Sequence, residues 1–156
     1  MATIITLTKK DIEILRGFWE DELIASHVYQ TLAWKVKDEK KKLFVKLSEI
    51  ENRHAKLWAK IARKYAGVEF RKTLRLRVKI FFHKILAKIM PLTFILNYLE
   101  NGEREAILSY SSFLEKFAGN EEVYMEIKSV VYDEIEHELS FVDILIGEKR
   151  YISSIK

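Results

Sequence analysis

The sequence of 156 residues contains no cysteine, a single proline and only five glycines. Without cysteine the chain has no disulfide, no thiolate-bound zinc, no iron–sulfur cluster and no rubredoxin-type redox centre. Any metal that it binds must therefore be held by carboxylates and imidazoles. Strand-length stretches with alternating β-branched residues are also scarce, and together with the shortage of helix breakers this composition predicts an all-α fold.

Long hydrophobic runs are missing as well. The longest, from Ile89 to Leu96, is far shorter than the roughly 18 residues that a membrane-spanning helix needs, and Met1–Lys10 has no charged-then-apolar signal pattern. We therefore expect a soluble, cytoplasmic protein. Because 49% of the residues are hydrophobic, the chain has enough apolar side chains for the core of one domain covering residues 1–156.

Acidic residues are absent from Phe70 to Leu99, where seven of the 27 basic residues lie. The net charge of +4 is therefore uneven, because the rest of the chain has 20 basic and 23 acidic residues, a balance of −3. A single cationic segment differs from the generally basic surface of a nucleic-acid-binding protein, so we predict no nucleic-acid partner.

Apolar residues recur at steps of three and four in four stretches, the pattern of helices that place one face in a core. The predicted helices cover about 9–37, 40–66, 91–118 and 121–146, with a crossover at 67–90 and a tail at 147–156. Short turns join the first helix to the second and the third to the fourth, which predicts a four-helix bundle of two hairpins. Trp19, Trp34 and Trp58 are expected to fill core or interface positions.

Two short patterns occur once in each predicted hairpin. They are Glu-x6-Tyr, at Glu22/Tyr29 and Glu103/Tyr110, and Glu-x-x-His, at Glu51/His54 and Glu134/His137. Side chains three residues apart on a helix are one turn apart, so both members of a Glu-x-x-His pair can bind one ion. Corresponding residues are 81 or 83 positions apart, which indicates that the two hairpins form an internal repeat.

The turns support this grouping. Residues on two antiparallel helices reach the same height when they are equally far from the connecting turn, and the midpoints fall at 36–37 for Glu22 and Glu51 and at 118–119 for Glu103 and Glu134. Two hairpins packed face to face would supply four carboxylates and two imidazoles, and two divalent ions would balance the carboxylate charge. The predicted ligands are Glu22, Glu51, His54, Glu103, Glu134 and His137.

At these residues the sequence resembles the rubrerythrin-like branch of the ferritin-like superfamily, whose signature occurs here as EDELIASHVY, EIENRH, GEREAILSY and DEIEHE. Within that branch, Leu43–Trp58 and LTFILNYLENGEREAILSY are most similar to erythrin-type domains linked to vacuolar-iron-transporter-like membrane proteins. The resemblance implies that Glu51 and Glu134 bridge two iron ions, that Glu22 and Glu103 are terminal or shifting ligands, and that each histidine binds one ion. Tyr29 and Tyr110 would then hydrogen-bond to ligating carboxylates, with plain core packing as the alternative.

The resemblance also implies a reaction, the oxidation of ferrous iron by dioxygen or peroxide, which ends as peroxide reduction or as iron handling. Without a rubredoxin domain, turnover would need a separate electron donor. The alternatives are a metal-binding accessory or sensor domain, such as the cytosolic part of an iron transporter, and a metal-free helical interaction module. Manganese or a mixed iron–manganese pair suits the same ligands. Ala106 stands where the family has a further glutamate one turn after Glu103, and Glu100 is the candidate substitute.

The basic segment 68–90 is long enough to run the length of a bundle between the two hairpins. Its apolar residues alternate with lysines and arginines. This pattern suits a plain crossover, a contact in a homodimer, or attachment to an anionic membrane or to a transporter. The sequence leaves these three alternatives open, and we expect a homodimer.

Overall fold

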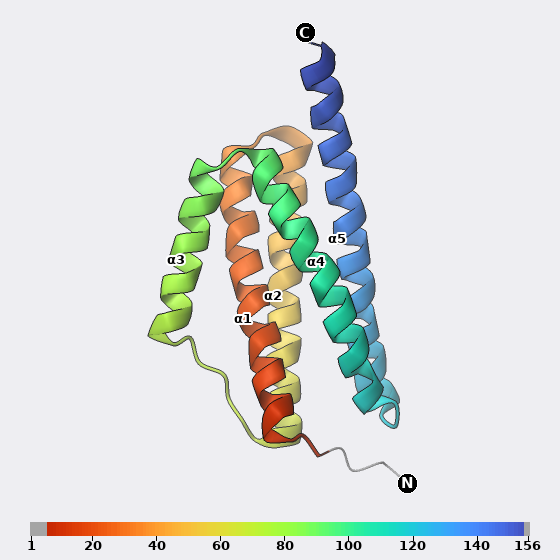
Figure 1. Ribbon diagram of the computed structural model, residues 1–156. Coiled ribbons are helices and arrows are strands. Elements are labelled where there is room, and N and C mark those ends of the chain that lie inside the picture. Colours follow the sequence, from red (N-terminus) through yellow and green to blue (C-terminus); the bar gives the residue numbers. More distant parts are fainter. Residues whose placement is uncertain (1–5, 155–156) are drawn as a thin grey trace. The chain divides into compact units, whose positions relative to one another are not determined.

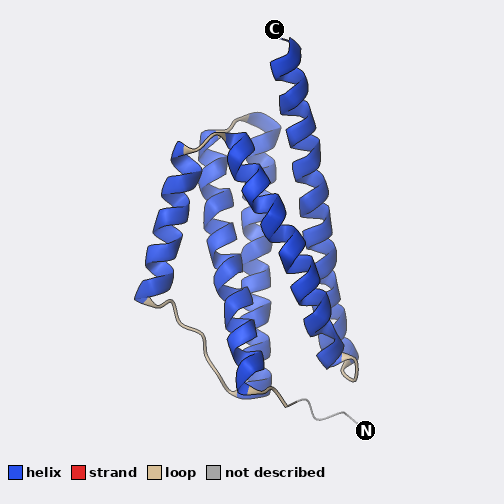
Figure 2. Cartoon of the chain, viewed as in Figure 1, coloured by secondary structure: helices blue, strands red, loops and turns tan. Residues whose placement is uncertain are grey.

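The computed structural model describes residues 6–154 and over that range contains helices and no strands (Figures 1 and 2). In chain order these are α1 (Lys9–Lys35), α2 (Asp38–Ala66), α3 (Leu74–Ile89), α4 (Leu92–Leu114), the short 3₁₀ turn η1 (Glu115–Phe117) and α5 (Glu121–Ser154). The chain divides into two compact units, Met1–Ile89 and Met90–Lys156. Each unit contains one helical hairpin, and the predicted all-α fold is confirmed.

The first unit is built on the hairpin of α1 and α2. Thr8 and Asp11 cap the start of α1, because the Asp11 N–H donates to Thr8 Oγ1 at 3.2 Å and the Thr8 N–H donates to Asp11 Oδ2 at 2.9 Å. The buried Ser26 hydroxyl donates to the Ser48 carbonyl at 2.8 Å and ties the two helices together. Because serine is small and its buried hydroxyl is hydrogen-bonded, the two helices can pack closely here without leaving that hydroxyl unpaired.

The ends of these helices follow local sequence signals. Between α1 and α2, Val36 and Lys37 are extended, so α1 ends two residues before the predicted position. Gly67 ends α2 in the left-handed conformation with φ 65°, and its N–H donates to the Arg63 carbonyl at 3.1 Å. Only glycine adopts this conformation without steric cost, which explains why the helix stops there.

The crossover is partly helical, as predicted, and its helix α3 packs on α1 within the first unit (Figure 1). Its buried residues are Leu76, Ile80 and Ala87. Lys79 Nζ lies 3.7 Å from Glu20 Oε2, and farther along both helices Lys35 Nζ donates to the Ala87 carbonyl at 3.2 Å. From the first contact to the second, the residue number increases in both helices, so α1 and α3 run in the same direction.

The second unit is the hairpin of α4 and α5. Pro91 precedes α4, and the Asn120 side chain accepts the Val123 N–H at 3.2 Å at the start of α5. Between them lies η1, whose Phe117 ring is fully buried and contacts Phe113, with ring centroids 5.7 Å apart. This hairpin therefore has its own capped ends and its own aromatic contact near the turn.

Two predicted boundaries in this unit were wrong. The third predicted helix does not continue to 118 but ends at Leu114, because the chain tightens into 3₁₀ hydrogen bonds such as Ala118 N–H to the Glu115 carbonyl at 3.2 Å. Helix α5 continues to Ser154, where the sequence analysis expected a tail from 147. No proline or glycine follows Gly147, so nothing in the sequence stops the helix there.

Among the described residues, no helix has both the length and the hydrophobicity needed to cross a membrane.

Candidate metal centre

The first set of candidate ligands comes together in the α1–α2 hairpin. Glu22 lies on α1, while Glu51 and His54 lie one turn apart on α2. His54 Nδ1 is 3.5 Å from Glu51 Oε2 and 3.8 Å from Glu22 Oε1. One ligand atom from each of the three residues lies within 4.8 Å of the others. The equal distances from the turn therefore place the two helices in the predicted register.

The second set repeats this arrangement in the α4–α5 hairpin. Glu103 lies on α4, and Glu134 and His137 lie one turn apart on α5. His137 Nδ1 is 3.2 Å from Glu134 Oε2 and 4.0 Å from Glu103 Oε2, and the three ligand atoms again lie within 4.8 Å of one another. In both hairpins Nδ1 is thus the imidazole nitrogen that faces the two carboxylates.

The donor types of both sets suit divalent metal ions. All six side chains are buried, with 1–6% of their surface exposed. Two carboxylates held a few ångströms apart in a low-dielectric interior repel each other, and a divalent cation between them removes that cost. Carboxylate oxygen and imidazole nitrogen suit iron and manganese, and the chain has no thiolate to favour a softer metal. The residues present therefore fit the metals that the sequence predicts.

Trp58 provides a contact to the first set that the sequence analysis missed. Its indole Nε1–H donates to Glu22 Oε1 at 3.1 Å, and its ring packs against Phe18 with centroids 5.1 Å apart. Trp58 is fully buried, as expected of a core residue, but it also orients a candidate ligand. Its position one turn after His54, on the same face of α2, is the sequence signal that could have revealed this contact.

The second hairpin has a different residue at the position of Trp58. Phe141 lies four residues after His137, just as Trp58 lies four residues after His54. Its ring is also fully buried, but phenylalanine has no hydrogen-bond donor. The two sets therefore share the types of their candidate ligands and differ in the residue one turn after the histidine.

The two tyrosines of the Glu-x6-Tyr pattern are buried, Tyr29 at 0% and Tyr110 at 3% exposure. The Tyr29 ring stacks on Phe44, with centroids 6.3 Å apart and an interplanar angle of 12°. These observations suit core packing and a hydrogen bond to a carboxylate equally well, so the proposed role of the hydroxyl groups stays a prediction.

Glu100, the candidate extra ligand, lies against a cation. Arg104 Nη2 donates to Glu100 Oε1 at 3.0 Å and to Glu138 Oε1 at 2.9 Å. The groups of described residues that could hold a metal do not include Glu100. An ion pair with Arg104 therefore accounts for this glutamate.

Trp34 and His27 lie outside both sets. Trp34 is 87% exposed, so it is not a core residue, and the alternative expectation of an interface position stays a prediction. His27 is half-buried and belongs to neither Glu-x-x-His pair. Burial, together with Lys72 and Lys84, lowers the pKa of His27 below its ordinary value.

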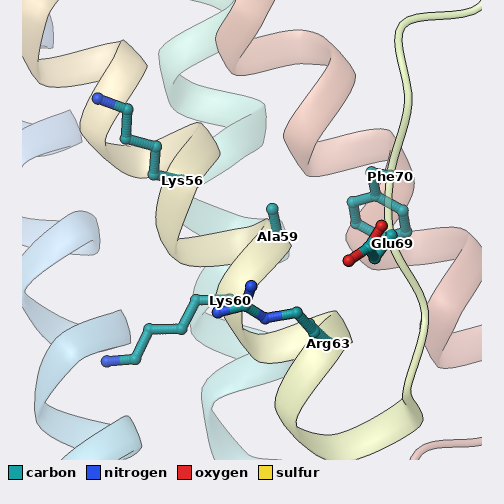
Figure 3. Close-up of a pocket in the computed structure, with 6 residues that line it drawn as sticks. All are labelled: Lys56, Ala59, Lys60, Arg63, Glu69 and Phe70. Carbon is teal, nitrogen blue, oxygen red and sulfur yellow. The ribbon is translucent and has the colours of Figure 1, made fainter.

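A separate cavity of about 280 Å³ lies in the first unit, between α2 and the segment that follows it. It is lined by Lys56, Ala59, Lys60, Arg63, Glu69 and Phe70. Figure 3 shows the Lys56 and Lys60 side chains extending away from Glu69 and Phe70. Since its charged groups do not converge, this cavity is not the functional site.

Comparison with known proteins agrees with the ligand pattern. The family model described as Rubrerythrin matches residues 13–145, a range that contains both hairpins and all six candidate ligands. No curated protein and no solved structure matches the chain. The family match and the buried carboxylate and histidine side chains together fit a dinuclear metal centre.

Proposed function

Because the chain belongs to the rubrerythrin family, we propose that it binds two iron ions and uses them to oxidise ferrous iron or to reduce peroxide or dioxygen. The observation that carries the proposal is the repeated ligand set, in which one histidine Nδ1 faces two carboxylates in each hairpin. The proposed ligands are Glu22, Glu51, His54, Glu103, Glu134 and His137.

Charge supports a pair of divalent ions. Four ionised glutamates carry four negative charges, which two divalent cations balance, and the neutral imidazoles add donors without adding charge. As the family resemblance implies, Glu51 and Glu134 would be shared by the two ions, and Glu22 and Glu103 would each serve one ion. Loss of a shared carboxylate would therefore disturb the whole centre.

When bound, iron supplies one-electron chemistry toward dioxygen and peroxide, which no side chain of this protein provides. The residues of the chain supply the ligand charge, the exclusion of bulk water and the orientation of the ligands. The Trp58 N–H fixes one oxygen of Glu22, so that carboxylate is held in one orientation. Tyr29 and Tyr110 are proposed to restrain ligating carboxylates in the same way, by hydrogen bonds from their hydroxyl groups.

The absence of cysteine favours ferrous iron oxidation over sustained peroxide reduction. Continuous reduction of peroxide needs an electron donor, and this chain has no rubredoxin-type centre to serve as one. Iron oxidation needs no other donor, because the ferrous ion itself gives up the electron. A separate reductase is therefore a required partner only for the peroxidase form of the proposal.

The same absence favours a second candidate, a domain that binds iron without turnover and acts as a sensor or as an accessory to an iron transporter. Such a domain would need the six ligands but no electron donor. The two candidates differ in one measurable property, the rate at which ferric iron or water is produced after the centre has filled.

The test is metal content followed by reactivity. The purified protein is stripped with a chelator, loaded anaerobically with ferrous iron and then exposed to oxygen, while bound iron and ferric absorbance are measured. We expect about two ions per chain, as four carboxylates and two imidazoles require, and ferric absorbance that continues to rise with added ferrous iron. Fewer than one ion per chain without ferric absorbance contradicts the proposal. Two bound ions without turnover, even with peroxide and a supplied reductant, identify the sensor or accessory domain.

A further inference from the structure

Helix α3 has an apolar outer face that nothing in the first unit covers. Its buried residues Leu76, Ile80 and Ala87 face α1, and six large apolar residues on α3 are 39–78% exposed. At about 100° per residue, these six fall within a sector of about 100° directly opposite the buried residues. They are Leu74, Val78, Phe81, Phe82, Ile85 and Ile89. The helix is thus apolar on two opposite sides, of which α1 covers one.

Basic residues border this outer face on both sides. On the same helical projection, Arg77, Lys84 and Lys88 lie along one edge, and Arg75 and Lys79 lie along the other. No acidic residue occurs from Phe70 to Leu99 to offset them. Lys79 is also 3.7 Å from Glu20 of α1, so the other four cations contribute most of the outward charge.

We propose that α3 lies flat on an anionic lipid bilayer, with its outer apolar face in the headgroup region and its two basic edges against lipid phosphates. An apolar strip between basic edges is the arrangement by which interfacial helices bind such surfaces. At 16 residues α3 is about 24 Å long, which is too short to span a bilayer but suits a helix lying in its plane. The proposal does not depend on the metal centre.

Charge decides between a bilayer and a second copy of the chain. If two copies paired through the outer face of α3, either helix direction would set a basic edge of one copy against a basic edge of the other. This like-charge contact would be unfavourable. Phospholipid headgroups of an anionic bilayer offer negative charge along both edges at once, and a juxtamembrane lysine or arginine near such a surface is worth about a fivefold change in partitioning.

Vesicle flotation of the full chain tests the proposal. The protein is mixed with vesicles of phosphatidylcholine alone or with about one third phosphatidylglycerol, at low and high salt. We expect binding to the anionic vesicles, weakened by salt, and little binding to neutral ones. The variant F81S/F82S should lower binding at least about tenfold through lost apolar insertion. The variant R75Q/R77Q/K84Q/K88Q should lower it about fivefold per charge.

Matched controls distinguish vesicle binding through the outer face of α3 from non-specific hydrophobic or electrostatic binding. L108S/L139S removes two apolar residues of the second unit that are 67% and 61% exposed, and K9Q/K10Q/K41Q/K46Q removes four exposed lysines of the first unit. Both controls should bind vesicles nearly as well as the original protein. Circular dichroism and iron content of each variant show that a loss of binding is not a loss of folding.

Three outcomes would overturn the proposal. The first is that anionic vesicles are not bound, and the second is that binding is unchanged by F81S/F82S. The third is a dimer in sedimentation equilibrium that F81S/F82S dissociates without vesicle binding, which would assign the face to a second copy. A Phe81→Trp variant in a Trp34→Phe background adds a direct probe, since its fluorescence should shift to shorter wavelength only with anionic vesicles.

Discussion

The two hairpins hold the same three types of candidate ligand in similar local geometry, yet they differ at one neighbouring buried position. In the first, the Trp58 N–H donates to Glu22 at 3.1 Å. In the second, the corresponding residue is Phe141, which fills the same kind of buried position without a donor. A hydrogen bond to a carboxylate orients it and favours its ionised form. The comparison therefore shows that the two sets, alike in ligand type, differ in whether the residue one turn after the histidine can donate a hydrogen bond to a glutamate.

The surroundings of the two hairpins differ as well. In the first, the basic helix α3 packs on α1, and Lys72 and Lys84 help to lower the pKa of His27. In the second, Arg104 links Glu100 and Glu138 at the surface of α4 and α5. An internal repeat that keeps its candidate ligands while their neighbours change would allow two bound ions to differ in affinity.

The largest effect is expected from the proposed bridging glutamates. Glu51→Gln and Glu134→Gln each remove a charge without changing shape, and each should reduce bound iron from about two ions per chain to fewer than one, with at least about a 100-fold loss of ferrous oxidation rate. Glu22→Gln and Glu103→Gln should each leave about one ion. Glu49→Gln and Glu136→Gln, at exposed positions two residues from a ligand, serve as controls. Equal, partial losses in all four ligand variants would show that no glutamate bridges the ions.

The next effect isolates the difference between the hairpins. Trp58→Phe removes the N–H that orients Glu22 and keeps an aromatic ring, so one of the two ions should bind about tenfold more weakly while the other is unchanged. Stepwise anaerobic titration with ferrous iron measures the two affinities. Trp19→Phe, a substitution at a largely buried tryptophan that packs on Phe70, is the matched control and should leave both affinities unchanged. A Trp58→Phe protein with two unaltered affinities would show that the hydrogen bond does not distinguish the sites.

Periodicity and spacing were enough to predict the hairpins and the convergence of two glutamates and one histidine in each, because both depend on contacts set by the helical repeat and the position of one turn. That these residues bind metal stays a prediction. The Trp58 contact could not be predicted in the same way. It joins residues 36 positions apart, and a tryptophan on an apolar stripe has the same pattern whether or not its N–H has a partner. The end of α5 was missed for a different reason, since no glycine or proline marks it after Gly147. The role of segment 68–90 could not be predicted either. Its helix α3 is apolar on two sides, and the sequence does not determine which side packs on α1 and which stays exposed.

A smaller effect is expected from glycines whose backbone conformations differ. Gly67 ends α2 with φ 65°, so Gly67→Ala should lower the free energy of unfolding by about 1 kcal/mol, as a side chain is strained in the left-handed region. Gly17 in α1 and Gly102 in α4 are within helices, and an added Cβ would meet nothing within 4 Å. Gly17→Ala and Gly102→Ala should therefore each raise it by about 0.5–1 kcal/mol. Urea unfolding of chelated protein measures all three, and a stabilising Gly67→Ala would refute the assigned role of the glycine.

The smallest effect is expected from His27 of α1, which lies close enough to the basic crossover for its lysines to act on it. The second hairpin has no equivalent residue, because its one histidine is the candidate ligand His137. The folded-state pKa of His27 is lowered from 6.5 by burial first and then by Lys72 and Lys84. Below pH 6.5 the unfolded chain therefore binds a proton that the folded chain resists, so stability falls as the pH decreases from that value toward the lower folded-state pKa.

His27→Gln should remove this loss, so the variant should gain stability relative to the original protein between pH 8 and pH 5 in urea unfolding. The substitution leaves every other ionisable side chain in place, so their contributions cancel in the difference. Adding Lys72→Gln and Lys84→Gln to the original protein should shrink the same difference, since desolvation alone would then hold the pKa down. A difference that does not change with pH would mean that folding does not lower the pKa of His27, and the contrast between the surroundings of the two hairpins would lose its electrostatic part.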